Sequence, residues 1–200
     1  MPNYIIKFTV SLKHTFLSKG YYFACIISLL LFLEAPFRAE CIEKYPEYQV
    51  KAEMLIKFPE FVDWPDSIFS SSEDPFIIAI AGKDPFGSYL KNLARKGKIK
   101  GHKIEIRFIE EGSSLPACHI LFIARTDESQ FMHLLALIDE KPILAVSDIE
   151  SFADRGAHIT FQVMRDRVRF SINQRSAIKH HLIITSQLLR LASNIIDDEE

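Results

Sequence analysis

The sequence has few cysteines, few glycines and little net charge. Its 200 residues include three Cys and seven Gly, and 24 Lys and Arg nearly balance 26 Asp and Glu. Three Cys are too few for a small disulfide-stapled scaffold. A formal net charge of −2 lacks the basic excess that nucleic-acid binding requires, so no nucleic-acid partner is expected. What is present, 48% apolar residues and 16 Phe, excludes a disordered chain and predicts one ordinary globular domain with a packed core.

The N-terminal region has the pattern of a secretory signal peptide. Three lysines and no acid precede an apolar run over residues 21–33, which as a helix would span about 20 Å, less than the ~30 Å hydrocarbon core of a membrane. We expect cleavage after Ala39, giving a signal peptide over residues 1–39 and one folded domain over residues 40–200, outside the cytoplasm. Phe37 stands where cleavage sites usually have a small residue, so an uncleaved anchor is the alternative. Cleavage removes four basic residues and one acid, which changes the formal net charge from −2 to −5.

Apolar runs and periodicities predict an α/β domain. Uniformly apolar runs predict buried central strands, alternating runs predict half-exposed strands, and helical spacing predicts the helices between them. In chain order we expect a helix over residues 48–58, strands over 75–82, 104–108, 119–124 and 142–148, helices over 84–94 and 128–138, a β-hairpin over 159–172 and a last helix over 173–196. The resulting fold class has three layers: a mixed sheet of about six strands with helices on both faces, an antiparallel hairpin at one edge and a long C-terminal helix.

Three polar or proline positions predict where helices begin and end. Pro59 should stop or kink the first helix near Phe58. Asp84 followed by Pro85 has the pattern of an N-cap with proline at the first helical position. Asn173 is the expected N-cap of the last helix.

No pattern in the chain after cleavage predicts a catalytic, metal or cofactor site. Its six His lack the spacing of a zinc-binding helix, and no nucleophile elbow is present. The loop over residues 82–87 joins a strand to a helix but lacks the known phosphate-binding glycine patterns, and Asp84 would repel a phosphate there. We therefore expect no enzymatic activity and no cofactor.

Two cysteines, Cys41 and Cys118, remain after the expected cleavage. Two cysteines are enough for one disulfide between them in an oxidising compartment. However, nothing in the sequence brings them together, and Cys118 enters an apolar strand where a thiol is usually an inert small hydrophobe. We expect no disulfide.

Two groups of residues are candidates for binding a protein partner. Phe58, Phe61 and Trp64 would anchor an interface if they were exposed, although such residues more often form the core face of a helix. Arg167 and Arg169 on the hairpin would form a charged rim, and the simpler interpretation of them is a solvated strand face.

A series of short motifs resembles the YfiR family of periplasmic proteins. The series extends over about residues 48–192, and the order and spacing of its members carry the resemblance. The motifs are Lys51-Ala52, Leu55, Lys57-Phe58, Phe61-Val62, Trp64-Pro65, Gly82-Lys83-Asp84-Pro85-Phe86-Gly87, Cys118-His119-Ile120-Leu121-Phe122-Ile123, Val146-Ser147-Asp148, Phe152-Ala153, Arg155-Gly156, Arg167-Val168-Arg169-Phe170-Ser171-Ile172-Asn173 and Leu188-Leu189-Arg190-Leu191-Ala192.

The resemblance implies an α/β fold, a periplasmic homodimer and no enzyme activity. Its best-known members bind the periplasmic part of an inner-membrane diguanylate cyclase, restrain it, and so lower cyclic di-GMP and biofilm formation. Some relatives use disulfides to tune this restraint. In this chain the partner cysteine would fall near Ala79, where no cysteine is present, and no cysteine pair follows Val146. The expected partner is therefore such a cyclase or another sensor protein, without control through those disulfides. A periplasmic small-ligand sensor, with its site at the carboxyl ends of the central strands, is the alternative.

Overall fold

The computed structural model describes residues 47–110, 112–124 and 128–197, all within the unit Glu43–Glu200. The expected signal peptide and Cys41 lie outside the described residues. No helix in the described part of the chain is long and apolar enough to cross a membrane.

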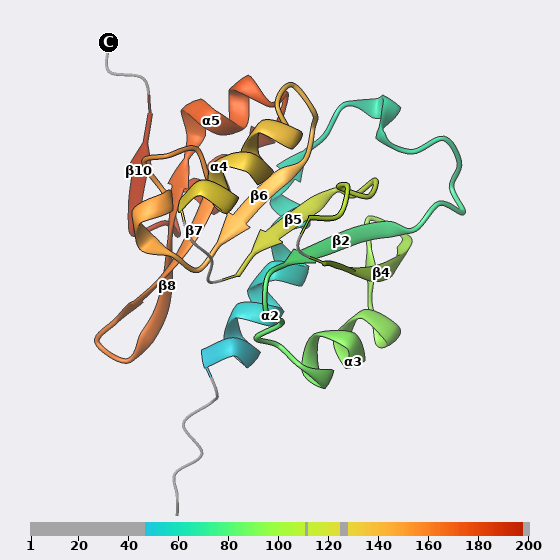
Figure 1. Ribbon diagram of the computed structural model, residues 1–200, viewed down its shortest axis with the longest axis horizontal. Coiled ribbons are helices and arrows are strands. Elements are labelled where there is room, and N and C mark those ends of the chain that lie inside the picture. The colour runs from blue at the N-terminus through green and yellow to red at the C-terminus, as the bar shows by residue number, and fades with distance from the viewer. Residues whose placement is uncertain (1–46, 111, 125–127, 198–200) are drawn as a thin grey trace, which may run out of the picture. The chain divides into compact units, whose positions relative to one another are not determined.

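An eight-stranded mixed sheet organises the domain (Figure 1). Its strand order is β10-β8-β7-β6-β5-β2-β4-β3, and every neighbouring pair is parallel except β7 with β8 and β3 with β4. The strands are β2 (Phe76–Ala81), β3 (Lys98–Ile99), β4 (His102–Ile109), β5 (Ile120–Ile123), β6 (Leu144–Ser147), β7 (Ile159–Met164), β8 (Arg167–Asn173) and β10 (Asn194–Ile196). Two short strands, β1 (Val62–Asp63) and β9 (Ile183–Ile184), pair antiparallel in a second sheet.

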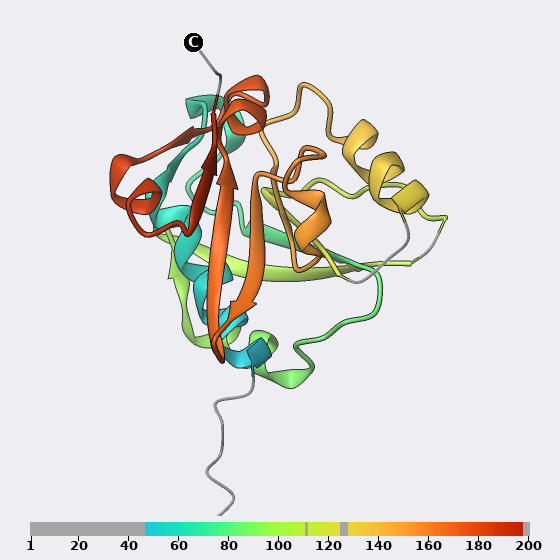
Figure 2. The ribbon, with the colours of Figure 1, turned by 90° about the vertical axis from the view of Figure 1, so that its left-hand side faces the viewer.

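Helices cover both faces of the large sheet. The α-helices are α2 (Glu47–Lys57), α3 (Ser88–Lys96), α4 (Glu128–Leu137), α5 (Gln174–Lys179) and α6 (Ser186–Leu189), and 3₁₀ helices span Phe58–Phe61, Asp66–Ile68 and Glu150–Phe152. Apolar residues of α2 and α3 pack on one face and those of α4 on the other. Figure 2 shows β7 and β8 standing nearly upright where β2 and β4 run across the view, so the sheet is strongly twisted.

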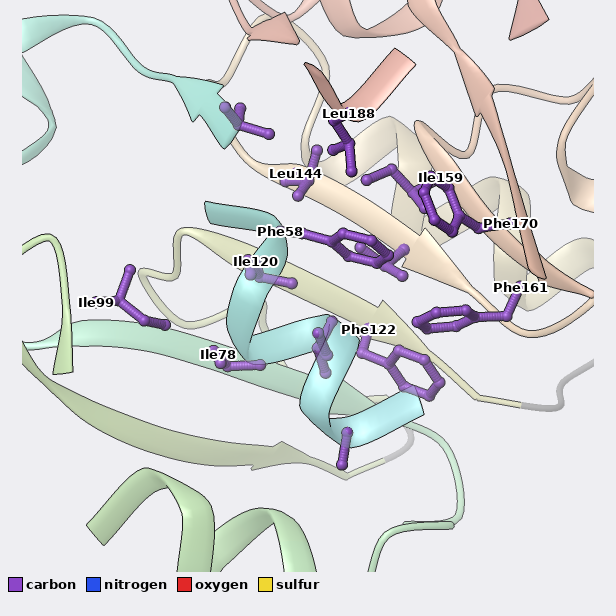
Figure 3. Close-up of a cluster of buried hydrophobic side chains, with 14 of the residues drawn as sticks. Phe58, Ile78, Ile99, Ile120, Phe122, Leu144, Ile159, Phe161, Phe170 and Leu188 are labelled. Carbon is purple, nitrogen blue, oxygen red and sulfur yellow. The ribbon is translucent and has the colours of Figure 1, made fainter. Parts of the chain in front are cut away.

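The two-residue period of the strands divides their side chains between two cores. All of β2 is buried; Ile78 and Ile80 face the cluster that contains α2, whereas Ile77 and Ala79 face the cluster that contains α4. Figure 3 shows the first cluster, where side chains of the central strands meet Phe58 and those of the β7–β8 hairpin. This explains why the central strands are uniformly apolar in sequence.

The sequence-based expectation for the sheet is confirmed in class and wrong in detail. The mixed sheet with helices on both faces is present, but it has eight strands, and two further strands, β1 and β9, form the small sheet. The predicted hairpin is β7–β8, but it does not lie at an edge because β10 pairs with the outer side of β8. The extra strands have only two or three residues each, which is too short to show a periodicity in sequence.

The prediction of a long C-terminal helix over residues 173–196 is wrong. Asn173 does cap a helix, since its side-chain oxygen accepts a hydrogen bond from the Ser176 amide at 2.8 Å, but α5 ends at Lys179. His181 has a left-handed backbone (φ 58°), and the β-branched residues that follow form β9, where Ile184 pairs with Val62. The segment then continues as α6 and β10.

Two other expected helix ends had different outcomes. The first helix does end before Pro59 and continues as a 3₁₀ turn, as predicted. Asp84 does not cap α3, because its carboxylate accepts from the amides of Phe86 (2.9 Å) and Gly87 (3.3 Å) and so closes a turn before the helix. Gly87, with φ 56° and ψ −133°, occupies a backbone region that is essentially restricted to glycine, which delays the helix to Ser88.

Candidate interaction site

The β7–β8 hairpin has one buried and one charged face. Phe161 pairs with Phe170 toward the core, while Gln162 pairs with Arg169 and Met164 with Arg167 on the opposite face. Its two-residue turn, Arg165-Asp166, has φ values of 50° and 59°, and two left-handed residues match the twist of a tight hairpin. The turn therefore presents the arginines of β8 and of the turn outward.

These arginines border a surface groove of about 780 Å³. The groove runs between the hairpin and the segment that connects α6 to β10, which supplies further apolar and basic side chains. We call it the arginine groove; its lining residues are Met164, Arg165, Arg167, Arg169, Arg190, Leu191, Ala192 and Ser193. Met164 and Leu191 are 52% and 61% exposed, so large apolar surface lies beside the positive charge.

The charge of the arginine groove is not neutralised within the described residues. None of its four guanidinium groups is within 4.0 Å of a carboxylate there, whereas Lys51, Lys100, Arg107 and Lys179 elsewhere each have an acidic partner. In a domain with an acidic balance, a local concentration of arginine and exposed apolar side chains is suited to a protein surface that carries carboxylates.

The structure brings together two of the five partner residues proposed from sequence. Arg167 and Arg169 are exposed and lie in the groove. Phe58 is 3% exposed and packs under the same hairpin, with ring centroids 5.5 Å from Phe161 and 5.1 Å from Phe170. In this structure its side chain therefore belongs to the core.

Phe61 and Trp64 are half-buried and lie at the small sheet, outside the groove lining. Trp64 packs edge-on against Phe76 at 5.6 Å, and Lys100 lies over its ring with Nζ 5.5 Å from the centroid. Its indole Nε1 is buried and has no hydrogen-bond partner among the residues described. Both aromatic residues remain candidates for a partner surface separate from the groove.

Sequence reasoning missed the remaining groove residues. Arg165 lies within the hairpin expected over residues 159–172 but was not proposed as a partner residue, although Arg167 and Arg169 beside it already indicated a basic cluster. Arg190 and Leu191 are distant in sequence and reach the groove only because β10 pairs with β8. No sequence pattern predicted that pairing.

A buried polar cluster anchors α2 over the end of β6. Lys51 is 3% exposed and forms ion pairs with Glu47 and with Asp148, whose Oδ2 lies 3.7 Å from Lys51 Nζ. Tyr48 donates a hydrogen bond to the same Oδ2 at 2.6 Å. Lys51, Asp148 and Tyr48 contact one another inside the domain, so the cluster positions the helix. Asp148 Oδ1 is buried without a hydrogen-bond partner among the described residues.

The histidines are dispersed, and some complete the sheet. His119 and His158 each accept a hydrogen bond at Nδ1 from a backbone amide of the neighbouring strand, Ile77 and Ala145 respectively, both at 2.9 Å. Burial lowers the pKa of His158 to about 3, and it also lowers the pKa of His119. His158 Nε2 lies 3.1 Å from His180 Nδ1. Across the described residues, no three His, Cys, Asp or Glu side chains are placed to hold a metal ion.

Two further hollows bear on the small-ligand alternative. One of about 270 Å³ lies at the carboxyl ends of β2 and β4 and includes Glu110 and His133; it is smaller than typical ligand pockets. The other, of about 640 Å³ between α4 and α5, includes Arg155, Arg175 and His180 but no Phe, Tyr or Trp. Lys179 in its wall is paired with Asp139 at 2.8 Å.

Cys118 is free and buried, and burial raises the pKa of its thiol to about 12. A thiol with this pKa is a poor nucleophile near neutral pH. Its environment agrees with the inert hydrophobe expected from sequence.

Comparison with known proteins places the whole arrangement in a family. No curated protein matches the chain. The sequence profile described as YfiR/HmsC-like matches residues 48–193, which include the central strands, the hairpin and both sides of the arginine groove. The chain belongs to the YfiR/HmsC-like family.

Proposed function

We propose that the protein is a periplasmic, non-enzymatic regulator that binds the periplasmic part of an inner-membrane diguanylate cyclase and restrains it, lowering cyclic di-GMP. Membership of the YfiR/HmsC-like family supports this class of function. The export step is part of the proposal: residues 1–39 act as the signal peptide and the domain of residues 40–200 is released.

The arginine groove is the single observation that carries the binding part of the proposal. Its four guanidinium groups can form paired hydrogen bonds with carboxylates, and Met164 and Leu191 supply the apolar contacts that exposed charges alone do not provide. Arginine and methionine are enriched at protein interfaces, and exposed ion pairs contribute mostly to specificity and association rate. We therefore place the cyclase contact on this groove, with Arg167 and Arg169 at its rim.

Restraint would follow from differential binding. A regulator that binds the inactive arrangement of the cyclase more tightly than the active one shifts the population toward the inactive arrangement. Dissociation of the regulator would then release the cyclase. No chemical step on the regulator is needed.

A small-ligand sensor is the second candidate. The hollow between α4 and α5 favours it, because about 640 Å³ is within the range of ligand pockets and its wall contains Arg155 and Arg175. A small molecule that raises the melting temperature of the purified protein would support this candidate.

The test of the proposal is genetic. Deleting the gene should raise cellular cyclic di-GMP, and restoring the wild-type gene should lower it again. The variant R167E/R169E should be exported and folded but should fail to lower cyclic di-GMP, because it reverses two charges at the rim. K83E/K96E makes the same charge change at two exposed lysines outside the groove and should restore control. Unchanged cyclic di-GMP after deletion would contradict the proposal.

A further inference from the structure

A basic segment lies at one end of the large sheet. Its residues, 85–104, include six Lys or Arg and no acid. They form α3, β3 and the start of β4, at the end of the sheet away from β8 and β10 (Figure 1). The domain expected after cleavage has a formal net charge of −5, so this segment locally reverses the charge of the molecule.

Two pairs of like charges lie in this segment. Lys98 of β3 is directly opposite Lys103 of β4, and directly opposite residues of an antiparallel pair point to the same face. Lys91 and Arg95 are four residues apart on α3, so they are also neighbours on the surface. Like charges in either arrangement are destabilising, so the stability of the domain does not explain their placement.

These four side chains are exposed, and none is within 4.0 Å of a carboxylate among the described residues. Lys100, in the same segment, differs because it pairs with Asp63 at 3.7 Å. Lys96 lies on the other flank of α3, two turns after Tyr89, which donates a hydrogen bond to Glu53 of α2 at 2.7 Å. We call the four unpaired residues the basic edge; they are Lys91, Arg95, Lys98 and Lys103.

An exposed aromatic ring accompanies the basic edge. Phe108 of β4 is 44% exposed, and Lys91 Nζ lies 4.5 Å from the centroid of its ring. Lysines beside exposed aromatic rings are typical of surfaces that meet a membrane, because the ring enters the headgroup region while the ammonium stays among the phosphates. The combination therefore indicates a lipid surface.

The kind of cation also favours phosphate over carboxylate. Three of the four residues are lysines, whose ammonium groups bind phosphates as point charges, whereas the planar guanidinium of arginine suits paired bonds to a carboxylate. Each Lys or Arg close to an anionic lipid surface strengthens binding about fivefold. Salt screens charges beyond about 10 Å, so the local cluster determines the attraction although the whole domain is acidic.

We propose that the basic edge docks the domain on a bilayer of anionic phospholipid, with Phe108 in the headgroup region. The inference rests on the proposed function only for location, since export would place the domain beside the inner membrane that holds the cyclase. The arginine groove borders β8, five strand spacings or about 24 Å along the sheet from β4, and remains free for the cyclase.

The test is cosedimentation of the periplasmic form of the protein with lipid vesicles. It should bind vesicles of equal parts phosphatidylglycerol and phosphatidylcholine, should not bind phosphatidylcholine alone, and should be released by added salt. K98E/K103E and K91E/R95E should each weaken binding by about 25-fold or more, since each removes two basic residues and adds repulsion. Phe108→Ser should weaken binding without changing its salt dependence.

The matched control is R167E/R169E, which makes the same change of charge at the distant groove and should bind vesicles like the wild type. Circular dichroism of each variant checks that it is folded. Free glycerol phosphate should not displace the protein, because binding requires an array of headgroups.

Three results would overturn the inference. They are equal binding to both kinds of vesicle or to neither, loss of binding in R167E/R169E but not in K98E/K103E, and displacement by glycerol phosphate. The second result would place the lipid on the groove, and the third would indicate a site for a single phosphate. None of them bears on capture of the cyclase from detergent-solubilised membrane, where no bilayer is present.

Discussion

Replacing Phe58 by alanine should destabilise the domain strongly. Phe58 is 3% exposed and packs against Phe161 and Phe170 at the junction of α2 with the hairpin. Truncation of a buried phenylalanine typically costs ~3–5 kcal/mol, because apolar contact is lost and a cavity remains. Domains have unfolding free energies of about 5–15 kcal/mol, so this is a large fraction of the total. At roughly 2–4 °C per kcal/mol for a domain of this size, the melting temperature should fall by about 6–20 °C.

The assay is urea unfolding of wild type and Phe58→Ala, followed by circular dichroism. The matched control is Met164→Ala, which truncates an apolar side chain that is 52% exposed and should change the unfolding free energy by less than about 1 kcal/mol. A loss below about 1 kcal/mol in Phe58→Ala, with an unchanged urea dependence, would refute the assignment of Phe58 to the core. If Phe58→Ala instead abolished cyclase binding at full stability, Phe58 would be an interface residue.

Three further predictions concern buried polar groups. Burial lowers the pKa of His158 to about 3 from an ordinary 6.5, so on acidification the unfolded chain takes up a proton that the folded chain does not. The free energy of unfolding should therefore fall by about 2–3 kcal/mol between pH 6.5 and pH 4.5. In urea unfolding at the two pH values, His158→Asn should reduce this difference. Lys51→Met should lower the free energy of unfolding, measured in urea, by ~3–5 kcal/mol, because it leaves Asp148 buried without its cation. K51M/D148N should lower it by less than the sum of the two single substitutions. Because burial raises the pKa of Cys118 to about 12, a thiol reagent at pH 8 should modify Cys118 slowly in the native protein and rapidly in denaturant. Equal modification rates of Cys118 in the two conditions would contradict its buried position.

The central strands were predictable because both of their faces are covered. The apolar run that includes Phe76 to Ala81 has no polar position, and a run of this length bounded by turn residues is typical of a strand covered on both faces. The alternation on either side of Arg165-Asp166 likewise defined the hairpin, since a two-residue turn leaves one register. These signals are local and strong.

The C-terminal segment was not predictable from local patterns. Ile178, Leu182 and Leu189 have helical spacing, yet Ile178 is 55% exposed and Leu182 is fully buried. Their positions depend on β9 pairing with β1 and on β10 pairing with β8, and both pairings join residues far apart in sequence. Tertiary pairing therefore overrode the helical period.

The arginine groove was half predictable for the same reason. Arg167 and Arg169 alternate along β8, so their common outward face follows from sequence. Arg190 and Leu191 join them only through the pairing of β10 with β8. A site built across a non-local strand pair leaves no spacing motif in the sequence.

Affinity capture from solubilised inner membrane tests the central claim most directly. The bait is the periplasmic form of the protein, compared with its R167E/R169E and K83E/K96E variants, and captured proteins are identified by mass spectrometry. The account predicts that wild type and K83E/K96E retain a membrane diguanylate cyclase, that R167E/R169E does not, and that added salt weakens the retention because the contact is ionic. Equal retention of the cyclase by R167E/R169E, or no cyclase with any bait, would contradict it.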